Sequence, residues 1–306
     1  SMMLARNLLT NKNLNSILDH VVLIIIPVYN VDGCLNRNSF SRVNQNGPEE
    51  YGFRGNAVNL DLNRDFIKCD SKNTLVFSKI FHDWSPDVFI DTHTSNGSDH
   101  QNVMTYIPTH PDKLNKNLSE YMQNSMIPFL ENKMKETGFE MSVYVNTVKE
   151  VPDSGIISFL ETPRYSTGYA ALFNTIGFIT ETHMLKEYEP RVWSTYHFLR
   201  YAVEIINKNS IEIGKLREKV KSETIKQEIF PISWMLDTTE LSEIDFKGYS
   251  AKYKTSPVTG MQQLYYDQKS HYNKKIRYYG KYVADQHVEK PIAYLIPQQW
   301  NEITEL

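Results

Sequence analysis

Three short apolar runs, each followed by polar or charged residues, constrain the fold of this 306-residue chain more than any other feature. Residues 21–29 form a continuous β-branched run, while residues 87–93 and 177–183 are shorter runs that end in chemically capable side chains. An apolar run without alternation is typical of a strand buried on both faces of a parallel sheet. We therefore expect three strands, and we expect residues 21–29 to be buried on both faces.

Amphipathic helical stretches lie between these runs. Residues 114–137 carry apolar side chains at helical spacing and stop at Gly138, and residues 192–206 repeat the pattern. Strands that alternate with helices indicate an α/β fold with a mixed, mostly parallel sheet flanked by helices. Ligands of such sheets bind beyond the carboxyl ends of the strands, where His93 and Glu181 fall.

The character of the chain changes after residue 207. Residues 208–229 form a charged helical connector with a sparse apolar face, and residues 230–306 are rich in Tyr, Thr and short alternating runs. We therefore predict three parts: an α/β domain over residues 1–207, this connector, and a small β-rich domain over residues 230–306. The smaller domain could cover the rim of a site, mediate oligomerisation or bind a partner.

Composition narrows the class of protein. The 33 Lys and Arg against 36 Asp and Glu give a net charge of −3, which argues against nucleic acid as a partner. No apolar run is long enough to span a membrane, so we expect a soluble protein. Cys34 and Cys69 cannot form a disulfide framework, and the oligomeric state and compartment stay open. A signal peptide ahead of residue 1 would make the protein secreted or periplasmic.

Two strand ends carry candidate catalytic groups. Asp91-x-His93 places a potential metal-binding imidazole on a rigid strand end, with a carboxylate nearby to orient the ring. Glu181 could act as a partly desolvated general base. Asp91 could instead be a buried, hydrogen-bonded residue with no metal role, and Glu181 could cap a backbone. His183, two residues after Glu181 on the same face of the strand, is either a neighbour of the site or a core residue, and we prefer the core interpretation.

A second group of candidates carries positive charge. Asn63-Arg64 offers a planar cation beside an amide, which suits a carboxylate bound in bidentate geometry. Arg54 offers another cation for charge that develops on a carbonyl oxygen. Taken alone, Arg64 would more simply pair with Asp61 or Asp65 at the start of a helix.

Four segments together carry a specific resemblance. The segments PVYNVDG, RGNAVNLDLNRDF, DTHTSNG and GFITETHM, in this order, resemble the zinc carboxypeptidase family, the carboxypeptidase A-like metallopeptidases, over roughly residues 4–200. The resemblance implies that His93 is the third zinc ligand and that Asn63 and Arg64 grip the terminal carboxylate of the substrate. It also implies that Arg54 polarises the scissile carbonyl. Glu181 would take a proton from zinc-bound water and pass it to the leaving amine.

The family also uses a mobile tyrosine that contacts the peptide and its terminal carboxylate. Residues 163–169 are the matching segment, and they leave the choice between Tyr165 and Tyr169 open. Arg164 in the same segment could add a positive charge to the site.

One family motif is missing from the sequence. The first two zinc ligands of the family form a His-x-x-Glu motif, and none of the nine histidines is followed by Glu three positions later. We expect this motif to lie just before residue 1 in an N-terminally truncated chain. The resemblance implies one Zn²⁺ per active site in the full-length protein. Because a catalytic zinc normally takes three protein ligands and a water molecule, a single histidine is not a competent site. This chain should bind zinc weakly or not at all, and should be inactive or nearly so.

The leading hypothesis is therefore a zinc-dependent carboxypeptidase-type peptide hydrolase, a metallocarboxypeptidase-like enzyme. Its substrate would be a peptide or amide with a free C-terminal carboxylate. One alternative is an amidohydrolase of small N-acyl amino acids on the same fold. Another is a non-catalytic peptide-binding pseudo-enzyme that retains the residues that grip the carboxylate.

Overall fold

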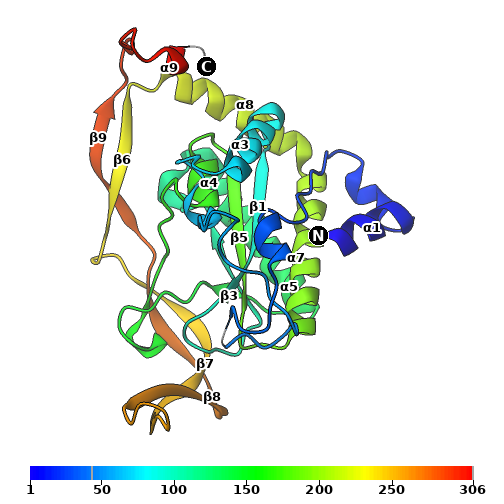
Figure 1. Ribbon diagram of the computed structural model, residues 1–306. Coiled ribbons are helices and arrows are strands. Elements are labelled where there is room, and N and C mark those ends of the chain that lie inside the picture. The colour runs from blue at the N-terminus through cyan, green and yellow to red at the C-terminus, as the bar shows by residue number, and fades with distance from the viewer. Residues whose placement is uncertain (43, 305–306) are drawn as a thin grey trace.

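The computed structural model describes residues 1–42 and 44–304 and shows an α/β body from which C-terminal strands project. In Figure 1, α1 lies on one side of the body and the ribbon of β6 and β9 lies on the opposite side. The β7–β8 hairpin extends below the body, and α8 crosses above it.

The helices and strands of the described residues follow the chain in this order. The helices are α1 Met2–Thr10, α2 Val31–Leu35, α3 Lys72–Trp84, α4 Lys116–Tyr121, α5 Ile127–Glu136, α6 Ser166–Ala171, α7 Tyr188–Lys208, α8 Ser210–Lys226 and α9 Asn301–Thr304. The short helical turns are η1 Asn15–Leu18, η2 Leu62–Arg64, η3 Pro111–Lys113, η4 Met122–Met126 and η5 Pro152–Ser154. The strands are β1 Val88–Ser95, β2 Met104–Pro108, β3 Ser142–Val143, β4 Ile156–Ile157, β5 Ile176–His183, β6 Ile229–Leu236, β7 Ser242–Thr255, β8 Gln262–Tyr279 and β9 Tyr282–Glu289.

The body is built on a four-stranded sheet with the order β1-β5-β2-β3. The pairs β1–β5 and β2–β3 are parallel, and β2 runs antiparallel to β5, so the predicted mixed, mostly parallel sheet is confirmed. Its core packs β5 against the flanking helices, with the rings of Phe178 and Phe198 6.1 Å apart between β5 and α7. The predicted helix over residues 114–137 is present as α4 and α5, joined through the π-helical turn η4.

The prediction of a buried strand at residues 21–29 is wrong. This segment forms no helix or strand in the structure, and Val22 and Ile24 are 76% and 42% exposed. A β-prone run becomes a strand only where a neighbouring strand completes its backbone hydrogen bonds, and among the described residues none pairs with it. Its end is nevertheless anchored, because the Tyr29 hydroxyl lies 2.9 Å from Thr74 Oγ1 and its ring stacks on Phe66.

The C-terminal part is rich in strands, as expected. The hairpin of β7 and β8 joins β4 in a three-stranded sheet, and β6 pairs with β9 in a separate ribbon. Since β4 lies before residue 207, this sheet connects the C-terminal strands directly to the α/β body. The domain boundaries at 207 and 229 stay a prediction.

The described helices include none that is long and apolar enough to cross a membrane.

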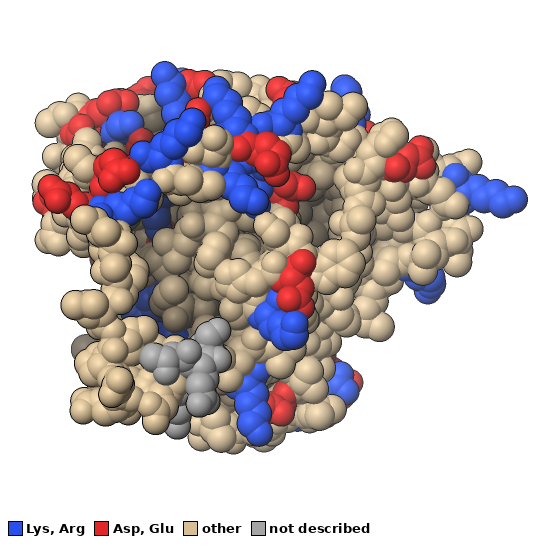
Figure 2. Space-filling model, turned by 90° about the horizontal axis from the view of Figure 1, so that it is seen from above, with Lys and Arg blue, Asp and Glu red and all other residues tan. Residues whose placement is uncertain are grey.

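Viewed from above, the molecule shows basic and acidic side chains interleaved over the end that carries α8 (Figure 2). The pair Lys219 and Glu223 of α8, whose charged atoms lie 3.9 Å apart, is one example of this mixing.

Candidate active site

Strand register brings three of the predicted side chains together. Asp91 and His93 are two residues apart on β1, so their side chains leave the same face of the sheet. The parallel ladder pairs His93 with Glu181 of the central strand β5. As a result, His93 Nε2 lies 2.8 Å from Asp91 Oδ2, and His93 Nδ1 lies 3.6 Å from Glu181 Oε1.

These groups are desolvated and strongly coupled in charge. Burial alone disfavours charge on the His93 ring, but the charges and hydrogen bonds of Asp91 and Glu181 outweigh it and raise the pKa of His93 well above its ordinary value. Burial also opposes ionisation of Asp91, but the His93 charge and hydrogen bonds lower its pKa. Glu181 Oε2 is buried and has no hydrogen-bond partner among the described residues. The His93 ring therefore lies between two carboxyl groups, one of which keeps a buried oxygen without a hydrogen-bond partner among the described residues.

A fourth titratable group, Glu161, belongs to this cluster and was not found from the sequence. Its side chain is 2% exposed, and Oε2 has no partner among the described residues. Burial raises the pKa of Glu161 to about 8; the His93 charge opposes this rise, and the charges of Asp91 and Glu181 add to it. Lys113 donates a hydrogen bond to the Glu161 backbone oxygen. A lone acid in an irregular segment, residues 158–165, offers no strand or helix period that could have revealed it.

Replacing Glu161 by glutamine is expected to stabilise the fold in a pH-dependent way. In the folded protein the pKa of Glu161, about 8, lies above its ordinary value of 4.5. The contribution of the Glu161 side chain to the free energy of unfolding is therefore fully present below pH 4.5 and is lost as the pH rises toward 8. Relative to wild type, E161Q should gain little near pH 4.5 and on the order of 4 kcal/mol near pH 8. Urea unfolding across this range measures the difference.

The exposed Glu120→Gln, on α4, is the control and should show no such trend. A constant difference between E161Q and wild type from pH 4.5 to 8 would contradict the burial of an ionisable Glu161.

The loop that carries Arg54 is held by the PVYNVDG segment. The side-chain amide of Asn30 donates hydrogen bonds to the backbone oxygens of Arg54 at 3.0 Å and Gly55 at 3.2 Å, and its oxygen accepts one from Gly33 at the start of α2. Asp32 Oδ2 accepts a further hydrogen bond from the Ala57 backbone amide at 3.0 Å. The two sequence segments therefore form one unit that fixes the course of the loop.

The cations of this region differ in their partners. Arg54 is half exposed and forms an ion pair with Asp61, with Nη2 and Oδ2 2.8 Å apart. Asp65 accepts hydrogen bonds from the Asp70 and Ser71 backbone amides and from the Thr74 hydroxyl. Asp61 and Asp65, the two acids that could have paired with Arg64, are thus bound to other groups.

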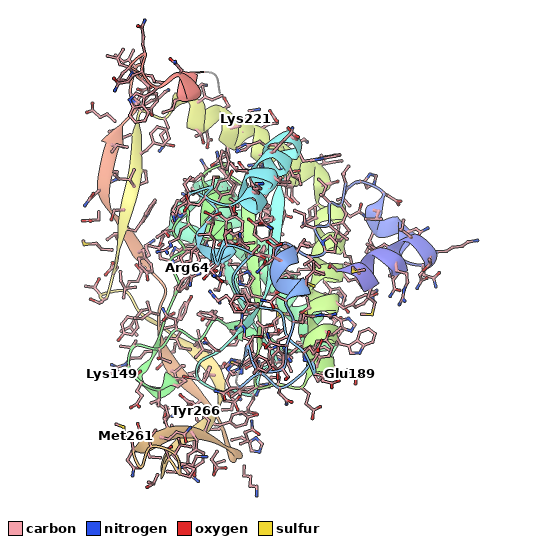
Figure 3. All side chains as sticks on the ribbon, in the orientation of Figure 1. Arg64, Lys149, Glu189, Lys221, Met261 and Tyr266 are labelled. Carbon is pink, nitrogen blue, oxygen red and sulfur yellow. The ribbon has the colours of Figure 1, made fainter. Side chains whose placement is uncertain are left out.

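Arg64 instead lies against an aromatic ring. Its guanidinium carbon is 4.5 Å from the centroid of the Tyr165 ring, and Nη1 donates to the Asn63 backbone oxygen at 2.7 Å. Figure 3 shows Arg64 on the side of the body that faces the C-terminal strands. The Asn63 side-chain oxygen is buried and has no partner among the described residues, so the fold does not use this acceptor. Arg42, which the sequence did not single out, lies close enough to Glu181 and Arg54 for their charges to affect its pKa, which burial lowers.

The two candidate tyrosines occupy different environments. Tyr165 is half-buried and precedes α6, and the guanidinium carbons of Arg64 and Arg164 lie 4.5 Å and 5.9 Å from its ring centroid. Tyr169 is 3% exposed in an aromatic cluster, and its hydroxyl lies 3.1 Å from both Ser78 Oγ and His82 Nε2. Only Tyr165 is therefore placed beside the cationic part of the candidate site.

A catalytic zinc normally takes three protein ligands and a water molecule. Among the described residues, no group of three His, Cys, Asp or Glu side chains is arranged to hold a metal ion. These residues offer His93 as a candidate ligand but do not fit a complete zinc site. The chemistry that they offer is that of their own carboxylates and cations.

Comparisons with known proteins agree with the resemblance of the motifs. The sequence model of the family described as zinc carboxypeptidase matches residues 1–172, so the chain belongs to the zinc carboxypeptidase family, whose cofactor is zinc. No curated protein matches the chain significantly.

Two solved structures are similar to part of the chain. A metallo-carboxypeptidase from Burkholderia cenocepacia matches with 14% identity and a TM-score of 0.37 over 52% of this chain. A metallo-carboxypeptidase from Pseudomonas aeruginosa in complex with (2-guanidinoethylmercapto)succinic acid matches with the same identity and TM-score over 53%. The match spans 42% of the length of each of these structures.

Proposed function

We propose that this chain is part of a peptide hydrolase of the metallocarboxypeptidase type, which acts on peptides with a free C-terminal carboxylate. The observation that carries this proposal is the register of β1 and β5, which places Glu181 beside His93 at the carboxyl ends of adjacent parallel strands. Membership of the zinc carboxypeptidase family supports the same class of reaction.

In this proposal, Arg64 and Asn63 bind the terminal carboxylate of the substrate. A guanidinium fork suits a carboxylate because two parallel N–H···O bonds can form, and the Tyr165 ring holds the guanidinium from one side. Arg54, which is half exposed and paired with Asp61, supplies a second cation for the oxygen of the scissile carbonyl.

Glu181 is the proposed general base. Its Oε2 atom is buried without a partner among the described residues, so it can accept a proton from water and pass it to the leaving amine. His93 lies against the other oxygen of this carboxylate, with Nδ1 3.6 Å from Glu181 Oε1, and Asp91 holds the far side of the ring at 2.8 Å. His93 is also the proposed zinc ligand of the family site.

Binding of a small peptide and of its C-terminal amide tests the proposal without requiring turnover. Isothermal titration calorimetry of this chain with Gly-Gly-Phe and with Gly-Gly-Phe amide compares a ligand that carries the carboxylate with one that lacks it. We expect the amide to bind at least tenfold more weakly, because a charge-assisted hydrogen bond contributes about 1.5–3 kcal/mol. Equal affinity for the two ligands, or no binding of either, would contradict the proposal.

A further inference from the structure

The segment that carries Glu161 and Tyr165 has no helix or strand of its own to hold it. Residues 158–165 lie between β4 and α6 and form turns and irregular backbone. Within the segment, the Tyr165 backbone N–H donates to the Thr162 oxygen at 3.0 Å. Backbone outside regular structure takes its position from the groups that pair with its polar atoms. The position of these two side chains of the candidate site therefore depends on what holds the segment from outside.

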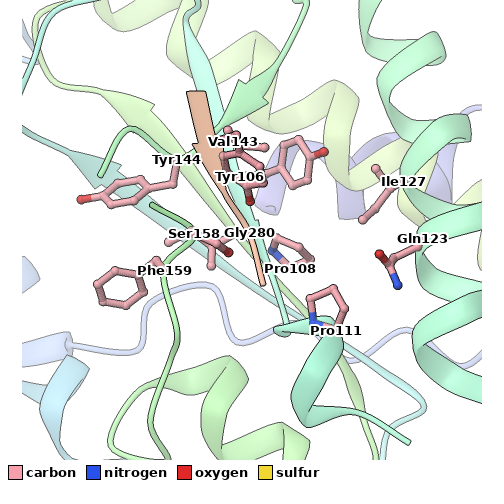
Figure 4. Close-up of a pocket in the computed structure, with 12 residues that line it drawn as sticks. Tyr106, Pro108, Pro111, Gln123, Ile127, Val143, Tyr144, Ser158, Phe159 and Gly280 are labelled. Carbon is pink, nitrogen blue, oxygen red and sulfur yellow. The ribbon is translucent and has the colours of Figure 1, made fainter. Parts of the chain in front are cut away.

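The end of β8 and the turn after it hold the start of this segment. The Ser158 backbone N–H donates to the Tyr279 oxygen at 2.8 Å, which continues the parallel pairing of β4 with β8. The Tyr282 hydroxyl donates to the Ser158 backbone oxygen at 3.0 Å. Figure 4 shows Ser158 beside Gly280 of this turn, in the wall of a small cavity that both residues line. Both polar atoms of the Ser158 backbone are thus paired with residues of the C-terminal strands.

Tyr282 is itself fixed by the α/β body. Its backbone N–H donates to Asp112 Oδ2 at 2.8 Å, and Lys281 donates to the other oxygen of that carboxylate at 2.7 Å. The Tyr282 ring packs edge to face on His110, with the ring centroids 4.9 Å apart. Asp112 lies in η3 and His110 directly precedes it, so both belong to the connection from β2 to α4. The body therefore sets the direction of the Tyr282 ring, and the hydroxyl can fix Ser158 rather than follow it.

The same connection also holds the segment at Glu161. Lys113 of η3 donates a hydrogen bond to the Glu161 backbone oxygen, and its Nζ lies 5.4 Å from the centroid of the Trp234 ring of β6. The Trp234 indole N–H donates to the Asp112 backbone oxygen at 3.2 Å. Two backbone oxygens of the segment are thus held by η3 and the C-terminal strands together.

The segment passes this support on to the candidate site. The ring of Phe159, which follows Ser158, lies 5.5 Å from the Tyr165 ring in an edge-to-face arrangement. The Tyr165 ring in turn lies 4.5 Å from the guanidinium carbon of Arg64. A displacement at Ser158 therefore reaches Tyr165 through one ring contact. The family model matches residues 1–172, so Tyr282 and the strands around it lie outside the family's part of the chain.

From these contacts we infer that Tyr282 is a positioning residue of the candidate site, whose hydroxyl fixes residues 158–165 so that Tyr165 stays against Arg64. The inference rests on the proposed function, in which Arg64 binds the carboxylate of the peptide. The C-terminal strands thereby support peptide binding through this segment rather than through contact with the peptide.

Tyr282→Phe tests this role because it removes only the hydroxyl and keeps the ring against His110. In hydrogen–deuterium exchange followed by mass spectrometry, residues 158–165 should exchange about threefold faster than in wild type, or faster still. Calorimetry should show about three- to tenfold weaker binding of Gly-Gly-Phe, since the arrangement that binds the peptide is less populated. The preference for Gly-Gly-Phe over its C-terminal amide should shrink as well, which a general loss of stability would not cause.

Tyr266→Phe is the matched control. It removes another hydroxyl of the C-terminal strands, one that donates to Ser98 Oγ at 2.8 Å, outside the segment. This variant should keep the exchange of residues 158–165 and the affinity for Gly-Gly-Phe within about twofold of wild type. Urea unfolding compares the stability of the two variants.

The outcomes separate the role of Tyr282 from the proposed function. If Arg64→Gln weakens the binding of Gly-Gly-Phe but a folded Tyr282→Phe variant binds it as wild type does, the positioning role is overturned and the proposed function stands. Unchanged exchange of residues 158–165, or an equal loss of affinity in Tyr266→Phe, overturns the positioning role as well. If wild type binds no peptide, or if Arg64→Gln leaves binding intact, the proposed function fails and the role of Tyr282 fails with it.

Discussion

Arg64→Gln is expected to weaken the binding of a peptide with a free C-terminal carboxylate by about 100-fold. Glutamine keeps a hydrogen-bond donor but removes the positive charge and the two-pronged geometry, and hydrogen bonds to charged groups contribute about 1.5–3 kcal/mol each. The fold should tolerate the change, because Asp61 and Asp65 are held by other groups. Calorimetry with Gly-Gly-Phe gives the affinity, and thermal unfolding by circular dichroism confirms that the variant is folded.

Arg164→Gln is the matched control for this prediction. Arg164 lies on the same Tyr165 ring, 5.9 Å from its centroid, but its side chain is exposed. Its replacement should change the peptide affinity less than about threefold. If Arg164→Gln weakens binding as strongly as Arg64→Gln, the carboxylate does not distinguish the two cations, and the assignment of Arg64 as the anchor is wrong.

The placement of His93 and Glu181 was predictable because it depends on strand periodicity. Both residues follow short apolar runs, and parallel neighbouring strands bring their carboxyl ends to one edge of a sheet. Asp91 followed from the two-residue repeat of a strand, which returns a side chain to the same face. The α/β class of the fold was predictable for the same reason.

Other features depend on partners that a local pattern does not specify. The run at residues 21–29 has the composition of a buried strand, yet it is partly exposed because no described strand pairs with it. Glu161 enters the cluster through an irregular segment, where no repeat predicts the direction of a side chain. The arginines of the region could be found as cations, but whether each is already paired depended on which carboxylate the loops bring to it.

The close approach of α6 to the segment that carries Glu161 predicts a large loss of stability when a side chain is added at Gly168. A Cβ added at Gly168 would lie 2.1 Å from the Thr162 backbone oxygen and 2.9 Å from that of Glu161. Because both are backbone atoms, a rotamer change cannot relieve the contact, and the helix must move away from the segment. Gly168→Ala is therefore expected to lower the free energy of unfolding by about 3 kcal/mol.

Gly214→Ala is the opposite case within a helix of the same protein. Gly214 lies in α8, and an added Cβ would meet no heavy atom within 4 Å, so alanine should raise the free energy of unfolding by about 0.5–1 kcal/mol through its higher helix propensity. Urea unfolding of both variants measures the two changes. Since Tyr165 lies between the displaced segment and α6, Gly168→Ala should also weaken the binding of Gly-Gly-Phe, whereas Gly214→Ala should not. A Gly168→Ala variant with wild-type stability and affinity would show that α6 does not set the position of this part of the site.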